Sequence, residues 1–366
     1  MIITQILQNL FKHIDSFLMA CLLFTLMIGL FVLYSASGES VERVAAQAIN
    51  IGVAISIMFL VANITPQNLE RIAVPLYTLG VLLLLAVELF GHTSHGATRW
   101  LNLGFIKIQP SEIMRISMPM MLAWFFAKRE DSASITDFII AAVLLIIPIA
   151  LIMKQPDLGT ALLICASGFY VLFLAGLSWK FLIGGAVSIG ALMPIFWSML
   201  HDYQRRRIEI LIDPTQDPLG AGYHTIQATI ALGSGGITGK GWLNGTQAQL
   251  DFLPERTTDF IFAVFGEEFG MAGNLILIVL FTLIIVRGLI IAGQAKSTFT
   301  RLLAGSITLT FFTYAFVNIG MVSGILPVVG VPLPLISYGG TSMVTLLLGF
   351  GILMSIQTHK KLVASG

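Results

Sequence analysis

Charged side chains are scarce in this sequence. Asp, Glu, Lys and Arg make up only 11% of its 366 residues, and the formal net charge is +1. Soluble proteins carry about a quarter charged residues, so the composition excludes an ordinary soluble protein. A nearly neutral chain also lacks the basic surface that nucleic acid requires, and no nucleic-acid partner is expected.

Cysteine is scarce as well. Cys21 and Cys165 both fall within apolar runs, where two packing thiols are favoured over a disulfide or a metal site. The sequence has no Cys/His pattern with zinc spacing, no solenoid repeat and no low-complexity tract. It therefore gives no sign of a zinc domain or a repeat protein.

Apolar residues, in contrast, make up 56% of the chain. Runs of about 20 residues recur along it, each long enough to cross the bilayer as a helix. They predict a single all-α, polytopic membrane domain over residues 1–366 with about ten transmembrane helices. The expected spans are 14–35, 45–61, 74–90, 111–126, 138–153, 158–177, 181–200, 271–293, 302–325 and 338–357.

Lysine and arginine predict the orientation of these spans. The positive-inside rule places both termini in the cytoplasm. The longest connection, residues 201–270 between spans 7 and 8, then lies outside, and connections of that length are usually functional or disordered. The short loops on the same outer side hold few basic residues, only Arg43, Arg99, Lys107 and Lys154.

The stretch "LDFLPERTTDFIFAVFGEEF", Leu250–Phe269, concentrates acid at one place in the long connection. Crowded carboxylates repel one another, so at least one should hold its proton more tightly, as a general base does. Such a cluster can also hold a divalent cation. The alternative is that Asp259, after a threonine N-cap, only complements a helix dipole. The acids are Asp251, Glu255, Asp259, Glu267 and Glu268.

Length predicts where this stretch lies. One helix from Asp259 to Arg287 would be about 42 Å long, which exceeds the bilayer, whereas Met271–Gly293 already spans it. We therefore expect "DFIFAVFGEEF" to form a separate helix at the outer surface, with its acids facing water or a cavity.

A second charged motif, "QPSEIMRIS", begins a span at Pro110 and Ser111. Glu112 and Arg115 stand at i and i+3, on one face of the expected helix. Charges within a span usually face a functional cavity, and an arginine there can bind phosphate bidentately. A self-neutralising ion pair is the alternative.

Two further motifs of the long connection carry basic residues. "YQRRRIEILI" predicts a short amphipathic helix whose Arg205, Arg206 and Arg207 suit either a lipid pyrophosphate or simple anchoring at the interface. "GSGGITGKGW", with Lys240, resembles a phosphate loop but lacks the Walker pattern, so nucleotide hydrolysis is not expected.

Two motifs outside that connection also carry signals. In "KQPDLGT", Asp157 is expected to cap a helix. "GILPVVGVPLPLISYGGTS", Gly324–Ser342, is broken by proline and glycine between the last two spans. Irregular backbone at membrane depth is tolerated where protein or a watery cavity covers it. The segment, with Ser337 and Gly339, therefore predicts a site or a gate.

Taken together, these motifs resemble the SEDS family of peptidoglycan polymerases over nearly the whole chain. The short amino end and "VGVPLPLIS" are closer to its elongation branch, which determines rod shape, than to its division branch. The motifs are "FLPERTTDFIFAVFGEEFG", "QPSEIMRIS", "KQPDLGT", "DPLGAGYHTIQ", "GSGGITGKGW" and "GMVSGILPVVGVPLPLISYGG".

The resemblance implies a glycosyltransferase that polymerises lipid II into β-1,4 glycan at the outer face of the cytoplasmic (inner) membrane. The family's essential aspartate falls on Asp259, as general base, and its second acidic position falls on Asp251. Thr257 replaces a histidine that is common in the family, and Arg115 replaces a lysine. An arginine cannot serve as a proton shuttle.

Charge on the departing pyrophosphate requires cations. Protein side chains rank slightly above a Mg²⁺ or Mn²⁺ ion held by loop acids such as Asp251, Glu255 and Glu267. The residues assigned to the pyrophosphate and its cavity are Glu112, Arg115, Arg205, Arg206, Arg207, Lys240, Ser337 and Gly339.

Besides lipid II, an undecaprenyl-pyrophosphate-linked disaccharide-peptide, the resemblance implies two kinds of partner. These are a class B penicillin-binding transpeptidase and other membrane proteins of the elongation complex. Two alternative functions stay open, a lipid II flippase or transporter and a non-catalytic scaffold. A scaffold would not need the carboxylate of Asp259.

Overall fold

The computed structural model describes residues 13–94, 97–102, 107–129, 133–155, 157–199, 205, 209–210, 213, 221–250, 252–253 and 255–362. These residues are almost entirely helical. The helices are α2 (Ser16–Ala36), α3 (Val41–Ala62), α4 (Pro66–Phe90), α5 (Pro110–Ala127), α6 (Ile135–Lys154), α7 (Leu158–Leu174), α8 (Trp179–Met199), α10 (Ala221–Ser234), α11 (Thr246–Gln249), α12 (Ile261–Gly293), α13 (Thr298–Val322) and α14 (Gly340–Leu362).

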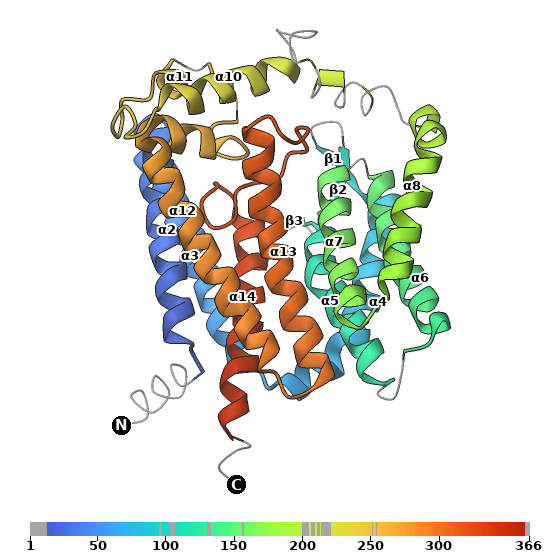
Figure 1. Cartoon of the computed structure of the whole chain (residues 1–366). Helices are drawn as coiled ribbons and strands as arrows, with labels where there is room; N and C mark the ends of the chain where they lie inside the picture. The colour runs from blue at the N-terminus through green and yellow to red at the C-terminus, as the bar shows by residue number, and fades with distance from the viewer. Residues whose placement is uncertain are drawn as a thin grey trace, which may run out of the picture.

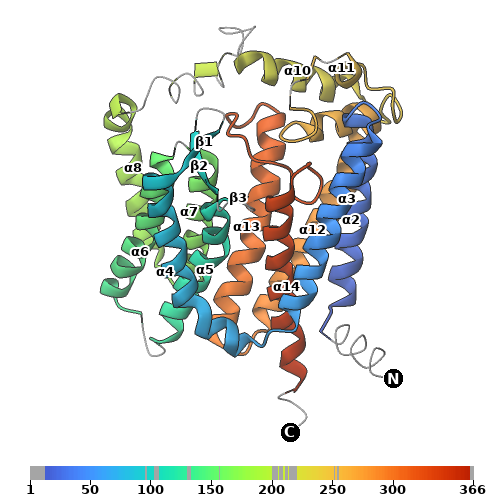
Figure 2. The same ribbon diagram turned by 180° about the vertical axis from the view of Figure 1, so that it is seen from behind.

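The long helices stand side by side as a bundle, and α10 and α11 lie across one end of it (Figures 1 and 2). We call this the loop end. The start of α2 and the end of α14 lie at the opposite end, as the predicted topology requires. Among the described residues, seven helices are long and apolar enough to cross a membrane: α2, α3, α4, α6, α12, α13 and α14.

Helices α5, α7 and α8 run alongside these seven, so the expected count of ten spans holds approximately. Many large apolar side chains point outward from the bundle, and Leu89 and Phe90 of α4 are 74% and 79% exposed. In water this exposure would be unfavourable, whereas a bilayer favours it. The chain is therefore an integral membrane protein of the expected all-α class.

A small sheet at the loop end was not predicted. Strands β1 (His92–Ser94), β2 (Ala97–Asn102) and β3 (Lys107–Ile108) pair antiparallel in the order β1-β2-β3. They precede α5, whose predicted start at Pro110 is confirmed. The expectation that both thiols pack inside is right for Cys21 but wrong for Cys165, which is exposed.

The acidic stretch differs from its expected form in two ways. Helix α12 begins at Ile261, so Asp259 precedes it, and the expected threonine cap is wrong because Phe260 is the N-cap without a side-chain bond. Glu267 and Glu268 are 0% and 1% exposed, so they are buried in protein and do not face water. The expected break between surface helix and span is present as a kink at Gly270.

At this kink, Gly270 has φ 64° and ψ −162°, and α12 bends around the loop 235–241, which we call the glycine loop. A Cβ on Gly239, whose φ is +80°, would collide with the carbonyl of Glu268, so the close approach requires glycine. Main-chain hydrogen bonds to the glycine loop satisfy amide and carbonyl groups of α12 that lose their helical partners at the kink. They are Lys240 N to Glu267 O, 3.0 Å; Gly241 N to Glu268 O, 3.0 Å; Met271 N to Gly236 O, 2.9 Å; and Ala272 N to Ile237 O, 3.0 Å.

Candidate functional site

The loop before α12 is bonded to the irregular segment between α13 and α14. We call residues 255–260 the acidic loop and residues 324–339 the proline segment. The Ser337 hydroxyl donates to the carbonyl of Thr258 at 2.6 Å and accepts the amide of Leu333 at 2.8 Å. The amide of Tyr338 donates to the carbonyl of Thr257 at 2.9 Å. Two residues immediately before Asp259 are thus fixed to the proline segment.

Asp259 itself is held from two more directions. Its carbonyl accepts the Asn318 amide at 2.8 Å, and the same amide donates to the carbonyl of Val331 at 2.7 Å. A Cβ placed on Gly330 would lie 3.4 Å from Asp259 Oδ2, so the carboxylate lies near the proline segment there. Gly330 has φ +74°, a conformation that favours glycine.

The environment of Asp259 changes its acidity. Burial, and secondly the negative charge of Glu255, raise its pKa from 3.8 to about 6. Burial disfavours the charged carboxylate, and a like charge nearby acts in the same direction. Glu255 is exposed, and its carboxylate accepts the Thr258 hydroxyl at 2.8 Å. The side chain of Asp259 can therefore accept a proton near neutral pH.

His224 of α10 adjoins the acidic loop, and the sequence analysis did not select it. Its ring stacks on Phe260, with centroids 5.8 Å apart. Burial lowers its pKa and Glu255 opposes that shift. Within the described part of the chain, its buried Nδ1 has no hydrogen-bond partner. The only signal in the sequence was its place in the motif "DPLGAGYHTIQ".

The Glu112–Arg115 pair lies at the contact of α5, α7, α13 and α14. Arg115 Nη1 is 2.8 Å from Glu112 Oε1, and the two side chains are 10% and 12% exposed. Arg115 Nη2 donates to the Thr160 hydroxyl at 3.2 Å, and the Thr345 hydroxyl donates to Glu112 at 2.9 Å. The ion pair is therefore formed, as one of the two alternatives from the sequence proposed.

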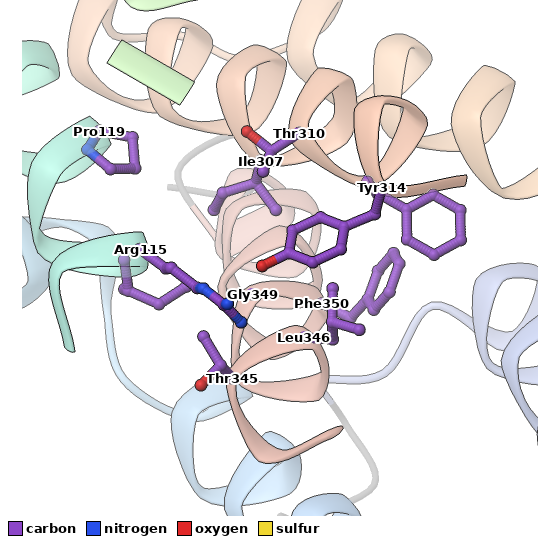
Figure 3. A pocket seen from close by; sticks show the side chains of 11 residues that line it. Arg115, Pro119, Ile307, Thr310, Tyr314, Thr345, Leu346, Gly349 and Phe350 are labelled. Atoms are coloured by element: carbon purple, nitrogen blue, oxygen red, sulfur yellow. The ribbon is translucent and has the colours of Figure 1, made fainter. Parts of the chain in front are cut away.

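Arg115 also faces a cavity. Its guanidinium lies 5.4 Å from the centre of the Tyr314 ring, and Figure 3 shows the two side chains pointing toward one another. The cavity, of about 40 Å³, is lined by residues of α5, α13 and α14, among them Arg115, Thr310 and Thr345. Arg115 Nε and Thr310 Oγ1 are buried and without partners among the described residues. One donor of Arg115 thus stays free for a ligand or a water molecule.

Helix α13 connects this pair to the acidic loop. Thr310, Tyr314 and Asn318 recur every four residues, so they lie on one face. Tyr314 also packs with Leu163 of α7 and with Val331 of the proline segment in one buried apolar cluster. A wider cavity of about 320 Å³ begins at Glu112 and is lined almost entirely by apolar residues of α3, α4, α5 and α14.

Lys240 and Glu267 bind each other instead of facing the acidic loop. Lys240 Nζ is 2.6 Å from Glu267 Oε1, which also accepts the Thr246 hydroxyl at 3.0 Å. The amide of Gln247 donates to both carboxylate oxygens at 3.2 Å. Glu268 accepts the Ser35 hydroxyl. This arrangement favours a structural role for the pair, which binds the glycine loop and its neighbours to α12.

The remaining candidates are dispersed. Arg205 donates to the carbonyls of Trp197 and Ser198 at 3.0 and 2.7 Å, which caps the end of α8. The amide of Gly339 donates to Gln47 at 3.3 Å. Arg206, Arg207 and Asp251 lie outside the described residues, as does most of the expected amphipathic helix. Asp157 caps α7 by accepting the amide of Thr160, as predicted.

A divalent cation has few ligands in the described part of this site. Those residues contain no group of three or more His, Cys, Asp or Glu side chains that could hold a metal ion. Glu255 and Asp259 are the two acids of the acidic loop, whereas Glu267 is already occupied by Lys240. Asp251, the third acid assigned to an ion, lies outside the described residues, so the choice between protein cations and a Mg²⁺ or Mn²⁺ ion stays a prediction.

Comparison with known proteins identifies the family. A family profile described as "Cell cycle protein", for FtsW, RodA and SpoVE, matches residues 15–362. The chain belongs to this family. It is the SEDS family that the motifs indicated, and the match includes both the acidic loop and the proline segment.

Individual SEDS relatives cover nearly the same length. The chain is 51% identical over 353 residues to the peptidoglycan glycosyltransferase MrdB of Escherichia coli K12, with 96% of this chain and 95% of MrdB covered. It is 34% identical over 365 residues to the probable peptidoglycan glycosyltransferase FtsW of Geobacter metallireducens, with 96% and 97% covered.

Solved SEDS structures share the fold. A chain from the structure on coordination of polymerization and crosslinking by a peptidoglycan synthase complex matches with a TM-score of 0.83 at 30% identity, covering 94% of this chain and 98% of that one. The crystal structure of the rod shape determining protein RodA of Thermus thermophilus matches with a TM-score of 0.71 at 26% identity, covering 94% and 96%.

Proposed function

We propose that Asp259 is the general base with which this peptidoglycan glycosyltransferase polymerises lipid II. The observation that carries the proposal is the position of its carboxylate, which lies against Gly330 with a pKa raised to about 6. A general base is most effective when its pKa lies near the working pH. The family membership supports the reaction class.

The chemistry requires one proton acceptor. As the 4-hydroxyl oxygen of the acceptor GlcNAc forms its bond to the donor's anomeric carbon, Asp259 takes the hydroxyl proton. The bond from that carbon to the pyrophosphate oxygen breaks, and the electron pair leaves with the lipid pyrophosphate. Attack from the opposite face inverts the anomeric carbon and gives a β-1,4 linkage. A positioned base contributes about 10²–10⁴-fold to such a step.

Arg115 is the described cation best placed for the leaving group. Its Nε has no partner and its guanidinium borders a cavity on the face of α13 that also carries Asn318. Developing negative charge in a water-poor site is stabilised strongly by such a fixed donor. The apolar cavity that begins at Glu112 suits part of the polyprenyl chain. Arg115 is also paired, with Glu112, but it keeps a buried donor without a partner beside a cavity, and neither Lys240 nor Arg205 does so among the described residues.

Location and partners complete the proposal. The scarcity of Lys and Arg in the short loops at the loop end supports an outer face there, with both termini in the cytoplasm and the bundle in the inner membrane. The similar chain from a peptidoglycan synthase complex supports a transpeptidase of the class B penicillin-binding type as partner, within an elongation complex. The similarity to MrdB supports the elongation branch.

The test is polymerisation of purified lipid II by the wild type and by Asp259→Asn, with the cognate transpeptidase present. We expect glycan from the wild type and none from the folded variant. Equal products from both would show that Asp259 is not the base. No product from either would favour the flippase or scaffold function. Addition of EDTA separates the two sources of positive charge, because only a Mg²⁺- or Mn²⁺-dependent enzyme loses activity.

A further inference from the structure

Asn318 is a polar residue in the middle of a packed helix face. It is 0% exposed, and its side-chain nitrogen donates to two main-chain carbonyls, of Asp259 at 2.8 Å and of Val331 at 2.7 Å. Those carbonyls belong to the acidic loop and the proline segment, which are separated by more than 60 residues of chain. One amide group therefore joins the two segments that meet at the Asp259 carboxylate.

We infer that Asn318 is a positioning residue that sets where the Asp259 carboxylate lies against the proline segment. The inference rests on the proposed role of Asp259. Asn318 does not touch the carboxylate but acts through the main chain on either side of it. One bond fixes Asp259 itself, and the other fixes Val331, directly after Gly330.

A buried amide side chain such as that of Asn318 lowers the stability of a fold, so its presence calls for a specific role. An amide buried among apolar groups is destabilising unless it is hydrogen-bonded. The side-chain nitrogen of Asn318 donates two hydrogen bonds, which satisfies both of its N–H groups. Its Oδ1, however, is buried without a partner among the described residues. A leucine, which is branched at the same carbon, would bury no polar atom of its own but would leave the carbonyls of Asp259 and Val331 without this donor. Joining the two carbonyls is the specific function that an asparagine can perform and an apolar residue cannot.

The two segments do not depend on Asn318 alone for their attachment. Ser337 bonds the carbonyl of Thr258, and Gln47 of α3 bonds both the carbonyl of Ser337 and the amide of Gly339, each at 3.3 Å. Loss of Asn318 should therefore leave the proline segment bound to the acidic loop. What changes is the last residue, Asp259, whose carboxylate gains freedom to turn toward water.

Two readouts distinguish positioning from a structural role. In Asn318→Leu we expect kcat for polymerisation to fall by about 100-fold, the size of effect that misplacement by about 1 Å causes, with a smaller change in KM. The acid limb of the pH–kcat profile should move to lower pH, since a better hydrated carboxylate ionises more readily. The other charged or titratable groups described at the acidic loop are unchanged in this variant: Glu255 and Arg256 of the loop itself, His224 of α10 and Tyr338 of the proline segment.

The matched control is Ser306→Ala on the same helix. Ser306 is also fully buried, and its hydroxyl donates to the carbonyl of Ser167 at 2.7 Å. It lies three turns of α13 from Asn318, so its loss should leave kcat and the acid limb at the wild-type values. Asn318→Ser, which keeps one short donor, should give values between those of the wild type and Asn318→Leu, and serves if the leucine variant does not fold.

Three results decide the inference. An unchanged acid limb in Asn318→Leu, or in Asn318→Ser where the leucine variant is unfolded, overturns it. A loss of kcat no larger than in Ser306→Ala also overturns it, because that loss reflects packing alone. The parallel variant Asp259→Asn separates this inference from the proposed function. If Asp259→Asn polymerises lipid II normally, the base has been misassigned, whatever Asn318 does.

Discussion

Tyr314 and Asn318 lie one helical turn apart on α13 and contact opposite parts of the site. The ring of Tyr314 lies 5.4 Å from the Arg115 guanidinium, and the amide of Asn318 lies 2.8 Å from the carbonyl of Asp259. A turn of α-helix advances about 5–6 Å, so one rigid element sets the spacing along its axis between the contact to Arg115 and the contact to Asp259. The proposed reaction needs that spacing fixed, because in it Asp259 acts on the nucleophile and Arg115 on the leaving group.

The acidity of Asp259 predicts a pH profile. Its pKa of about 6 arises from burial and, secondly, from the charge of Glu255. Glu255→Gln removes the second cause, so the pKa should fall and the acid limb of polymerisation activity should move to lower pH. The measurement is kcat between pH 5 and 8. Glu42→Gln, which removes an exposed acid from the start of α3, is the control and should leave the limb in place.

The same raised pKa predicts that Asp259 makes the fold less stable as the pH rises. A carboxyl whose pKa rises from 3.8 to about 6 on folding stabilises the fold fully below pH 3.8, and this contribution is lost as the pH rises through 6. Asp259→Asn cannot ionise, so at pH 8 it should unfold at a higher temperature than the wild type. The corresponding gain in the free energy of unfolding is at most about 3 kcal/mol. Near pH 4 the two proteins should unfold alike. A variant destabilised equally at both pH values would contradict this account.

The Lys240–Glu267 pair predicts a loss of stability and not of substrate binding. Lys240→Met leaves a carboxylate of 0% exposure without its cation. Breaking a buried pair in this way costs about 3–5 kcal/mol. The double variant Lys240→Met with Glu267→Gln should recover much of that loss in thermal unfolding and keep its KM for lipid II. A single variant of normal stability but raised KM would instead assign Lys240 to the pyrophosphate.

The position of Gly330 beside Asp259 predicts that a larger side chain there lowers activity as well as stability. Gly330→Ala places a methyl group 3.4 Å from Asp259 Oδ2 in a backbone of φ +74°. The strain alone costs about 1–2 kcal/mol. Gly176→Ala, at φ +102° with open space around it, carries the strain without the contact. We expect a similar loss of stability in both variants, but a loss of kcat only in Gly330→Ala.

Features with a local signal could be predicted from the sequence. Asp157 before an apolar run caps α7, Pro110 begins α5, and the length argument placed a break between Asp259 and the span that follows. Each depends on residues within about one helical turn or on the thickness of the bilayer. The Glu112–Arg115 contact is also local, since both residues share one helix face.

Features set by distant partners could not be predicted. Five acids in one stretch suggested a shared outward site, but Glu267 is bonded to Lys240, 27 residues earlier, and Asp259 faces Gly330. Asn318 appeared as one polar residue in an apolar span. Only the fold places it between two carbonyls. His224 was overlooked because its neighbour, Phe260, lies in another element.

The bend at Gly270 also has a mechanical consequence. The glycine loop is bonded to α12 on both sides of the bend, so the outer turns of the helix and the glycine loop form one stiff unit. Its surface includes Ile237, which is 69% exposed, and its inner end begins beside Asp259. Because these bonds hold α12 on both sides of Gly270, the bend is braced and does not act as a free hinge. The first turn of α12, directly after Asp259, is thereby kept at a fixed angle to the part of the helix that spans the membrane.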